Sequence, residues 1–230
     1  MASFQSGYRK HHSCETAVIK IHNDILLKID KKNHVILMLL DLSAAFDTIN
    51  HQKLISKLQK HYGFGGNIIS WVKSYLSDRS FRVTVNNTQS SECPLTIGVP
   101  QGSILGPLLF ILYTKELEYV AQKHGFSVHL YADDTQIYIS FEPNGNSDMY
   151  LQRLQSCYND IKRWMTQNYL KLNDDKSEII ELHGMHSQYD PRARFQLDVD
   201  CIIEPIDTAK NLGFMFDNTL SLDSHISHIS

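Results

Sequence analysis

Two adjacent acidic residues, Asp133 and Asp134, lie between two short runs in which apolar and polar residues alternate. Residues 128, 130 and 132 share one parity before the acids, and residues 137, 139 and 141 share one after them. This alternation predicts a hairpin of two half-buried strands. No Asn-Gly or Asp-Gly pair marks the bend, so the acids themselves are expected to make the turn. Adjacent carboxylates repel unless a cation lies between them, so the tip is either an exposed acidic turn or a divalent metal site.

A third acid, Asp41, follows an unbroken apolar run that begins at residue 35. A run of this length and composition is typical of a central strand that is covered on both faces. A carboxylate at the end of such a strand needs a partner, because burying it alone costs free energy. Asp41 is therefore either the N-cap of a following helix or a metal ligand.

Residues 97–103 form a loop rich in glycine and proline that leads into an apolar run. Pro107 is compatible with a helix there only within the first turn. Glycines let backbone amides approach a ligand closely, and a helix N-terminus favours anions, so a nucleotide phosphate is one candidate neighbour of the loop. A plain tight connection is the other. Lys176 precedes a later apolar run and is either a solvated lysine or part of the same site.

The composition excludes several classes of protein. The 230 residues are 42% hydrophobic and 20% charged, with a net charge of -3, which argues against a protein dedicated to coating nucleic acid but leaves room for a local basic groove. The four cysteines form no Cys-x-x-Cys pair, which argues against a zinc ribbon or a disulfide framework and favours a reducing compartment. The first ten residues contain no apolar core for a signal peptide, and no apolar run is long enough for a membrane span, so we expect an intracellular protein of the cytoplasm or nucleus without a membrane partner.

The elements that must hold these residues follow from apolar spacing and capping residues. Ser13 is a candidate N-cap for a helix that ends near residues 31–33, and Asp47 or Asn50 for a later one. Asn86 and Asn87 are expected to turn a hairpin over residues 81–94. We further predict helices over residues 68–76 and from 104, a long helix over 149–165, strands at 177–182, 195–203 and 210–216, and a final helix from 221.

In this order the motifs closely resemble the palm of reverse transcriptases, in particular those of non-LTR (LINE-like, jockey-type) retrotransposons. Any one motif alone would be weak, whereas the set in the same order is specific and spans nearly the whole chain. The matching segments are Leu40-Asp-Leu-Ser-Ala-Ala-Phe-Asp-Thr48, Gly98-Val-Pro-Gln-Gly-Ser-Ile-Leu-Gly-Pro-Leu-Leu-Phe110, Tyr131-Ala-Asp-Asp134, Leu170-Lys-Leu-Asn-Asp-Asp-Lys176 and Asn211-Leu-Gly213, with Gln5-Ser-Gly-Tyr-Arg9 resembling the family's fingers segment.

The resemblance implies a two-metal site for nucleotidyl transfer. Asp41, Asp133 and Asp134 would be the acidic ligands, and Leu42 would add its backbone carbonyl. Two Mg²⁺ ions are the expected cofactors, with Mn²⁺ as a substitute, because hard oxygen donors suit such ions. Phe46 stands where reverse transcriptases carry an aromatic side chain that crowds the sugar 2′ position. This residue favours deoxynucleotides and argues against an RNA-directed RNA polymerase.

Other roles are also implied by the resemblance. Lys176 would donate a proton to pyrophosphate as a general acid. Leu212 and Gly213 would belong to the primer grip. The residues expected to contact the incoming nucleotide or the template are Arg9, Gln101, Gly102 and Tyr131.

The expected fold is an α+β polymerase palm, an antiparallel sheet with helices packed on one face. Residues 1–34 would be a partial fingers segment, 35–217 the palm with an inserted fingers hairpin, and 218–230 the truncated start of a following helix, with the thumb absent. The expected partners are an RNA template, a DNA primer and deoxynucleoside triphosphates. The alternative is a catalytically inactive remnant of a retrotransposon that binds RNA or a protein.

Overall fold

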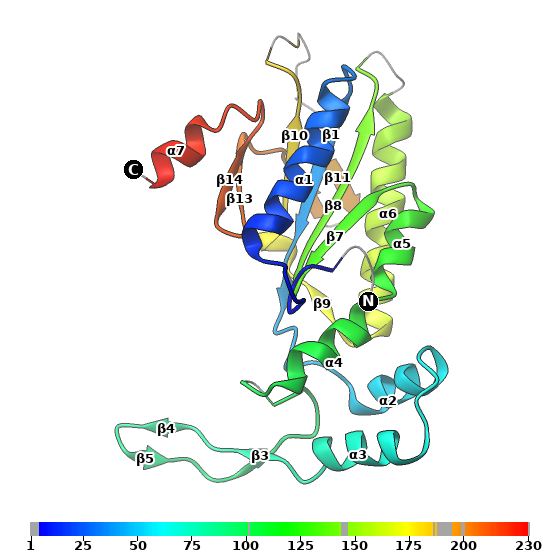
Figure 1. Ribbon diagram of the computed structural model, residues 1–230, viewed down its shortest axis with the longest axis vertical. Helices are drawn as coiled ribbons and strands as arrows, with labels where there is room; N and C mark the ends of the chain where they lie inside the picture. The colour runs from blue at the N-terminus through cyan, green and yellow to red at the C-terminus, as the bar shows by residue number, and fades with distance from the viewer. Residues whose placement is uncertain are drawn as a thin grey trace.

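A four-stranded antiparallel sheet is the centre of the fold in the computed structural model (Figure 1). The structure describes residues 5–100, 102–143, 147–185, 187, 195–198 and 201–229. The strand order is β10-β1-β8-β7, where the strands are β1 (His34–Leu40), β7 (Ser127–Tyr131), β8 (Asp134–Phe141) and β10 (Glu178–Leu182). This is the predicted palm sheet, built from the strand before Asp41, the hairpin with the two acids and the strand at 177–182.

Helices cover both faces of the sheet, so the expectation that they pack on one face is wrong. Helix α1 (Cys14–Ile29) covers one face, where its Ile21 and Ile25 share a core with Leu37 of β1 and Tyr138 of β8. The other face is covered by α6 (Ser147–Gln167) and by α4 (Leu105–Thr114) and α5 (Leu117–Lys123). Strand β8 has side chains in the cores on both faces of the sheet, Ile137 and Ile139 in one and Tyr138 in the other, so it is not half-buried as its alternation suggested.

Local capping determines where several helices begin. Ser13 caps α1 in a capping box with Thr16, as its position before the apolar stripe predicts. Asn50, one of the two predicted candidates, caps α2 (His51–Lys60) by accepting a hydrogen bond from the Lys53 amide at 2.9 Å. Helix α5 was not predicted from the sequence. It is only seven residues long, too short for a clear periodic signal.

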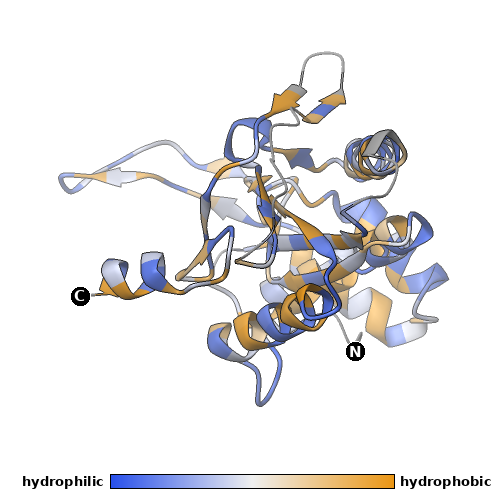
Figure 2. Ribbon diagram, turned by 90° about the horizontal axis from the view of Figure 1, so that it is seen from above, coloured by the Kyte–Doolittle hydropathy of each residue, from blue (hydrophilic) through white to orange (hydrophobic). Residues whose placement is uncertain are grey.

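A long hairpin projects from the body beside α3 (Gly66–Leu76), as Figures 1 and 2 both show. Its four short strands are β3 (Ser80–Phe81), β4 (Thr84–Val85), β5 (Thr88–Gln89) and β6 (Cys93–Pro94). Asn86 and Asn87 both have positive φ at its tip, which confirms the predicted turn. Every strand residue of this hairpin is exposed.

Two runs that were predicted as single strands are hairpins. Residues 195–203 contain β11 (Phe195–Asp198) and β12 (Cys201–Ile203), whose register shifts between Gln196 and Asp198. Residues 208–217 contain β13 (Thr208–Asn211) and β14 (Phe214–Asp217). Here Leu212 and Gly213 have φ of 51° and 82°, so the backbone folds back at a point that apolar spacing does not reveal. Helix α7 (Asp223–Ile229) follows, in agreement with the predicted final helix.

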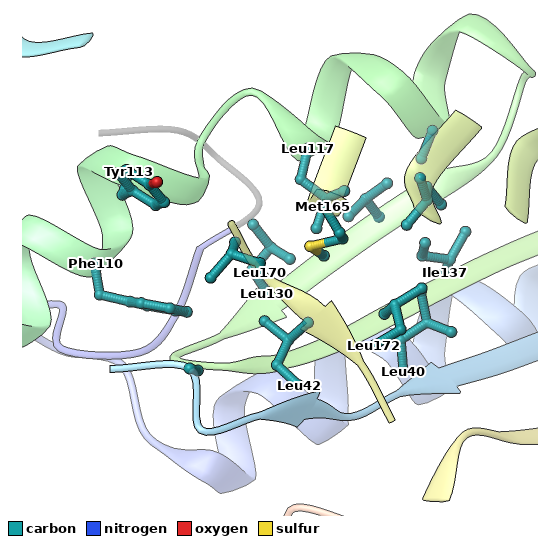
Figure 3. Close-up of a cluster of buried hydrophobic side chains, with 14 of the residues drawn as sticks. Leu40, Leu42, Phe110, Tyr113, Leu117, Leu130, Ile137, Met165, Leu170 and Leu172 are labelled. Carbon is teal, nitrogen blue, oxygen red and sulfur yellow. The ribbon is translucent and has the colours of Figure 1, made fainter. Parts of the chain in front are cut away.

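The larger apolar core lies between the sheet and helices α4 to α6 (Figure 3). Leu40 and Leu42 point into it from the strand that carries Asp41, and Ile137 enters from β8. Around it, the helices present apolar and polar residues on opposite sides (Figure 2). Within the described ranges, no helix combines the length and the apolar character needed to cross a membrane.

Candidate active site

The turn between β7 and β8 brings the two adjacent acids to one end of the sheet. Tyr131 pairs with Asp134, so the turn consists of Ala132 and Asp133, and Asp134 already belongs to β8. Ala132 has φ of 57°, whereas neither acid has a positive φ. The expectation that the acids make the turn is therefore only half right. The left-handed conformation, which costs a residue with a Cβ about 1 kcal/mol, falls on the alanine.

The segment at residues 5–8 supports this turn from outside. Gln5 lies beside Leu130, whose carbonyl accepts a hydrogen bond from the Ser6 amide at 2.9 Å. The Gln5 Oε1 atom accepts hydrogen bonds from the amides of Gly7 (2.7 Å) and Ala132 (3.3 Å). A Cβ atom on Gly7 would collide with the backbone nitrogen of Ala132. The amino-terminal motif and the acidic motif are thus packed together.

Strand register places Asp41 beside Asp134. Leu40 pairs with Thr135 in the β1–β8 ladder, so the next residue on each strand toward the turn is an acid. Leu40 and Leu42 both enter the core (Figure 3). Alternation along the backbone therefore directs Asp41 to the opposite side. Leu42 begins β2 (Leu42–Ser43), which pairs with β9 (Lys171–Leu172).

Asn173 holds Asp41 at two points. Its backbone amide donates to the Asp41 carbonyl at 2.9 Å, and its Nδ2 atom donates to Asp41 Oδ2 at 3.1 Å. The Asn173 side chain therefore restricts the rotation of the carboxylate. Asp41 is not a helix cap, because Asn50 caps the next helix.

A small open cleft of about 120 Å³ receives these groups. Asp41 and Asp134 line it together with Lys176, which ends the short 3-10 helix η1 (Asp174–Lys176), and Lys210 of β13. The Asp134 side chain reaches solvent at the end of β8. Nevertheless, burial of its carboxylate, followed by the negative charges of Asp133 and Asp41, raises its pKa to about 6. All three acids thus act on one another electrostatically.

The chemistry of the donors fits a hard divalent cation. Carboxylate oxygens are the ligands that Mg²⁺ and Mn²⁺ prefer, and the mutual repulsion of Asp41, Asp133 and Asp134 is what a bound cation would relieve. Within the part of the chain that the structure describes, however, no group of three or more His, Cys, Asp or Glu side chains is gathered closely enough to hold a metal ion. Asp41 and Asp134 share one cleft, Asp133 lies in the adjacent turn and does not line it, and the three acids form no closed ligand shell.

Phe46 and Tyr131 lie near the ends of the strands. The Phe46 ring packs on Phe110 of α4 with centroids 4.8 Å apart, so it is held at the edge of the core and does not line the cleft of Asp41. The Tyr131 side chain interacts with Cys14 at the start of α1. This hydrogen bond, together with burial, raises the pKa of Tyr131 to about 12. Arg9 is half-exposed and follows the segment that supports the acidic turn.

The glycine-rich loop is fixed mainly by internal contacts. Gly98 has φ of 82°, and a Cβ there would lie 2.8 Å from the Asp47 carbonyl oxygen, which fits the plain tight connection. Ser103 accepts a hydrogen bond from the Tyr75 hydroxyl at 2.7 Å and donates one to the Pro100 carbonyl at 2.6 Å. Gly102 is exposed, with φ of 73° and open space around its Cβ position. Gln101 lies outside the described residues.

Leu212 and Gly213 form the turn of the β13–β14 hairpin, and the strand residue just before them, Asn211, lines the same cleft as the acids. The predicted primer grip thus lies next to the predicted metal ligands. Sequence reasoning did not single out the other polar residues of the cleft and its supports. These are Gln136, Asn173, Glu178, Lys210 and Asn211. Asn173 and Asn211 lie inside matching motifs, which was the available signal.

Comparison with known proteins gives consistent results. The family model described as reverse transcriptase (RNA-dependent DNA polymerase) matches residues 1–216. The probable RNA-directed DNA polymerase from transposon BS of Drosophila melanogaster is 30% identical over 96% of this chain and 24% of its own length. The polymerase from the mobile element jockey of the same organism is 25% identical over 98% of this chain and 24% of its length. This chain therefore spans about a quarter of these relatives.

Among solved structures, an apo telomerase from Candida tropicalis truncated from its C-terminal domain has a TM-score of 0.60. The match covers 95% of this chain and 40% of the telomerase chain, with 15% sequence identity. A likeness at this level of identity concerns the fold alone. It agrees with the palm-type arrangement of sheet and helices.

Proposed function

Because the chain belongs to the reverse transcriptase family, we propose that it catalyses RNA-templated DNA synthesis for a retrotransposon of the non-LTR class. The observation that carries the proposal is the shared cleft of Asp41 and Asp134, with Asp133 close enough to help raise the pKa of Asp134 to about 6. Three acids that repel one another are retained at one end of a buried sheet. Such an arrangement is costly in a purely structural role and useful where cations act.

Asp41, Asp133 and Asp134, with the backbone carbonyl of Leu42, would hold two Mg²⁺ ions, and Mn²⁺ would substitute. When bound, these ions favour ionisation of the primer 3′-hydroxyl and neutralise the leaving pyrophosphate. The protein contributes orientation: Asn173 fixes the Asp41 carboxylate through its 3.1 Å hydrogen bond. Lys176 lines the same cleft and would hold the proton at Nζ that pyrophosphate receives.

Selection of the sugar is assigned to Phe46. Its ring packs against Phe110, and a ring held in this position would exclude a 2′-hydroxyl by contact. Arg9, Tyr131, Gln101 and Gly102 are the proposed contacts to the nucleotide and template. The partners are an RNA template, a DNA primer held at Leu212 and Gly213, and deoxynucleoside triphosphates. The proposed compartment of the reaction is the cytoplasm or the nucleus.

Primer extension on poly(rA)/oligo(dT) with Mg²⁺ tests the function directly. The purified chain, and any longer protein that its gene encodes, are each supplied with dTTP or with UTP. We expect incorporation of dTTP well above that of UTP. A heat-treated sample and a reaction without template are the controls.

The binding of primer–template, measured by fluorescence anisotropy, separates the alternatives. Both forms folded and bound to primer–template, with no incorporation under Mg²⁺ or Mn²⁺, would contradict the polymerase and support a non-catalytic remnant. Incorporation of UTP as efficient as that of dTTP would instead indicate an RNA polymerase.

A further inference from the structure

A single buried side-chain pair links the β13–β14 hairpin to the strand that carries the acids. The Nε2 atom of Gln136 donates to Oδ1 of Asn211 at 3.1 Å, across 75 residues of sequence. Gln136 is 1% exposed and Asn211 is 5% exposed, so water hardly competes for this bond. A buried hydrogen bond between distant segments fixes both its length and its direction.

The two residues occupy positions next to the proposed reaction centre. Gln136 follows Asp134 by two residues on β8, so both side chains lie on the same face of the sheet. Asn211 is the last residue of β13, immediately before the turn at Leu212 and Gly213. Both line the cleft together with Asp41 and Asp134.

The rest of the hairpin is held differently. Its entrance is attached to β10, where the Ile206 amide donates to the Ile179 carbonyl at 2.9 Å, and Ala209 and Phe216 pack in the smaller core. Phe214 contacts the ring of His22 on α1, with centroids 6.1 Å apart. The turn itself is joined to the strand of the acids through Asn211.

The energetics suggest that this pair serves position more than stability. Within the described ranges, Gln136 Oε1 and Asn211 Nδ2 have no hydrogen-bond partner, although both atoms are buried. Leaving such atoms unpaired destabilises the fold, and two apolar side chains of similar shape would be at least as stable. Apolar contacts, however, do not fix a distance and a direction as a hydrogen bond does.

We propose that Gln136 and Asn211 are positioning residues whose hydrogen bond sets the separation between the Leu212–Gly213 turn and the carboxylates of Asp41 and Asp134. A primer end held at the turn then lies at the correct distance from the acids. The identity of the primer rests on the proposed function. The mechanical link between hairpin and strand does not, and it is measured separately.

The decisive variants are Gln136→Leu, Asn211→Leu, the double Leu variant, and the swapped variant, which combines Gln136→Asn with Asn211→Gln. The swap moves one methylene from one side of the pair to the other, so the summed length and the hydrogen bond are kept. Gln196→Leu on β11, where the side chain is exposed, is the matched control. Each variant is tested for primer–template KM, kcat, dTTP KM, hydrogen exchange of the amides at 208–217, and unfolding in urea.

We expect each single Leu variant and the double variant to lose on the order of 10–100-fold in kcat/KM for primer–template, because small displacements of reacting groups have effects of this size. The dTTP KM should change less than threefold, and hydrogen exchange of the amides at 208–217 should accelerate. The swapped variant should recover most of the loss. The double variant should remain as stable as the wild type while staying impaired, which a merely structural role does not allow.

Wild-type kinetics and wild-type hydrogen exchange in the double Leu variant would overturn the proposal. Failure of the folded swapped variant to recover either property would overturn it as well. If the wild type extends no primer at all, the proposed function fails. The hydrogen-exchange data then test the link alone. Faster hydrogen exchange in the single variants, with recovery in the swapped variant, supports the link, and unchanged hydrogen exchange refutes it.

Discussion

At the scale of single residues, the chemistry depends on a few side chains whose surroundings change their properties. Asp134 is the clearest case, because burial and two neighbouring acids raise its pKa to about 6. Asp41 is constrained by Asn173, and Phe46 by Phe110. Motif order allowed Asp41, Asp133, Asp134 and Phe46 to be predicted as one site. The supporting hydrogen bonds are tertiary, so no spacing rule could reveal them.

Replacing Phe46 by Ala should raise the incorporation of ribonucleotides relative to deoxynucleotides by about tenfold or more, because the loss of a single steric contact typically changes discrimination on this scale. The ratio of incorporated UTP to dTTP is the measurement, since the loss of packing on Phe110 also affects total activity. Phe81→Ala, on the exposed hairpin, is the control. An unchanged ratio would remove the steric role of Phe46.

Replacing Asn173 by Ala should lower kcat on the order of 10–100-fold, because the Asp41 carboxylate loses the donor that restricts its rotation. The backbone bond from residue 173 to the Asp41 carbonyl remains, so the fold should be retained. Single-turnover primer extension is the measurement, with Asn67→Ala on the exposed side of α3 as the control. Equal rates for both variants would show that Asn173 does not position Asp41.

At the scale of elements, the acidic turn is held in place by the segment at residues 5–8. Gln5 accepts a hydrogen bond from Ala132, and Gly7 leaves no room for a side chain beside it. The sequence predicted the β7–β8 hairpin because alternation and turn residues are local signals. It did not predict that the β13–β14 run folds back, because Leu212 carries its positive φ without being a typical turn residue. Apolar spacing also did not divide residues 195–203 into β11 and β12.

The change Gly7→Ala should displace the acidic turn, because the new Cβ would overlap the Ala132 backbone nitrogen. We expect a loss of about 1–3 kcal/mol in the free energy of unfolding, typical of overpacking, together with a larger fractional loss of primer extension. Gly65→Ala is the control, since open space surrounds its Cβ position and its φ is ordinary. Wild-type stability and activity in Gly7→Ala would contradict the support of the turn by this segment.

At the scale of the whole molecule, helices cover both faces of the sheet, and the fold buries an acid that the proposed reaction does not use. Glu181 on β10 is 4% exposed, and its Oε2 has no partner among the described residues. Burial raises its pKa from 4.5 to about 7. The overall palm sheet was predictable from motif order, whereas this burial was not, because it depends on tertiary packing around β10.

Stability should therefore fall as the pH rises from about 4.5 to about 7, because the folded state binds a proton that the unfolded state has already released. Below this window the contribution is fully favourable, and above it the loss is complete at about 3 kcal/mol. Glu181→Gln should lose the part of the slope that Glu181 supplies, while the smaller part from Asp134, whose pKa is also raised, remains. Urea unfolding at pH 5 and pH 8 measures it, with exposed Glu142→Gln as the control. Equal slopes in wild type and Glu181→Gln would contradict the assignment.

The acids at one end of the palm sheet are the centre of the proposed polymerase, and the change Asp133→Asn tests them most directly. Asp175→Asn is the matched control, because Asp175 is an exposed acid just before Lys176 and, unlike Asp133, is not one of the charges that raise the pKa of Asp134. In primer extension with dTTP and Mg²⁺, Asp133→Asn should lose at least about 100-fold in rate while its circular dichroism and urea midpoint stay near those of the wild type. Asp175→Asn should retain its rate. Wild-type extension by a folded Asp133→Asn protein would contradict the metal-dependent site.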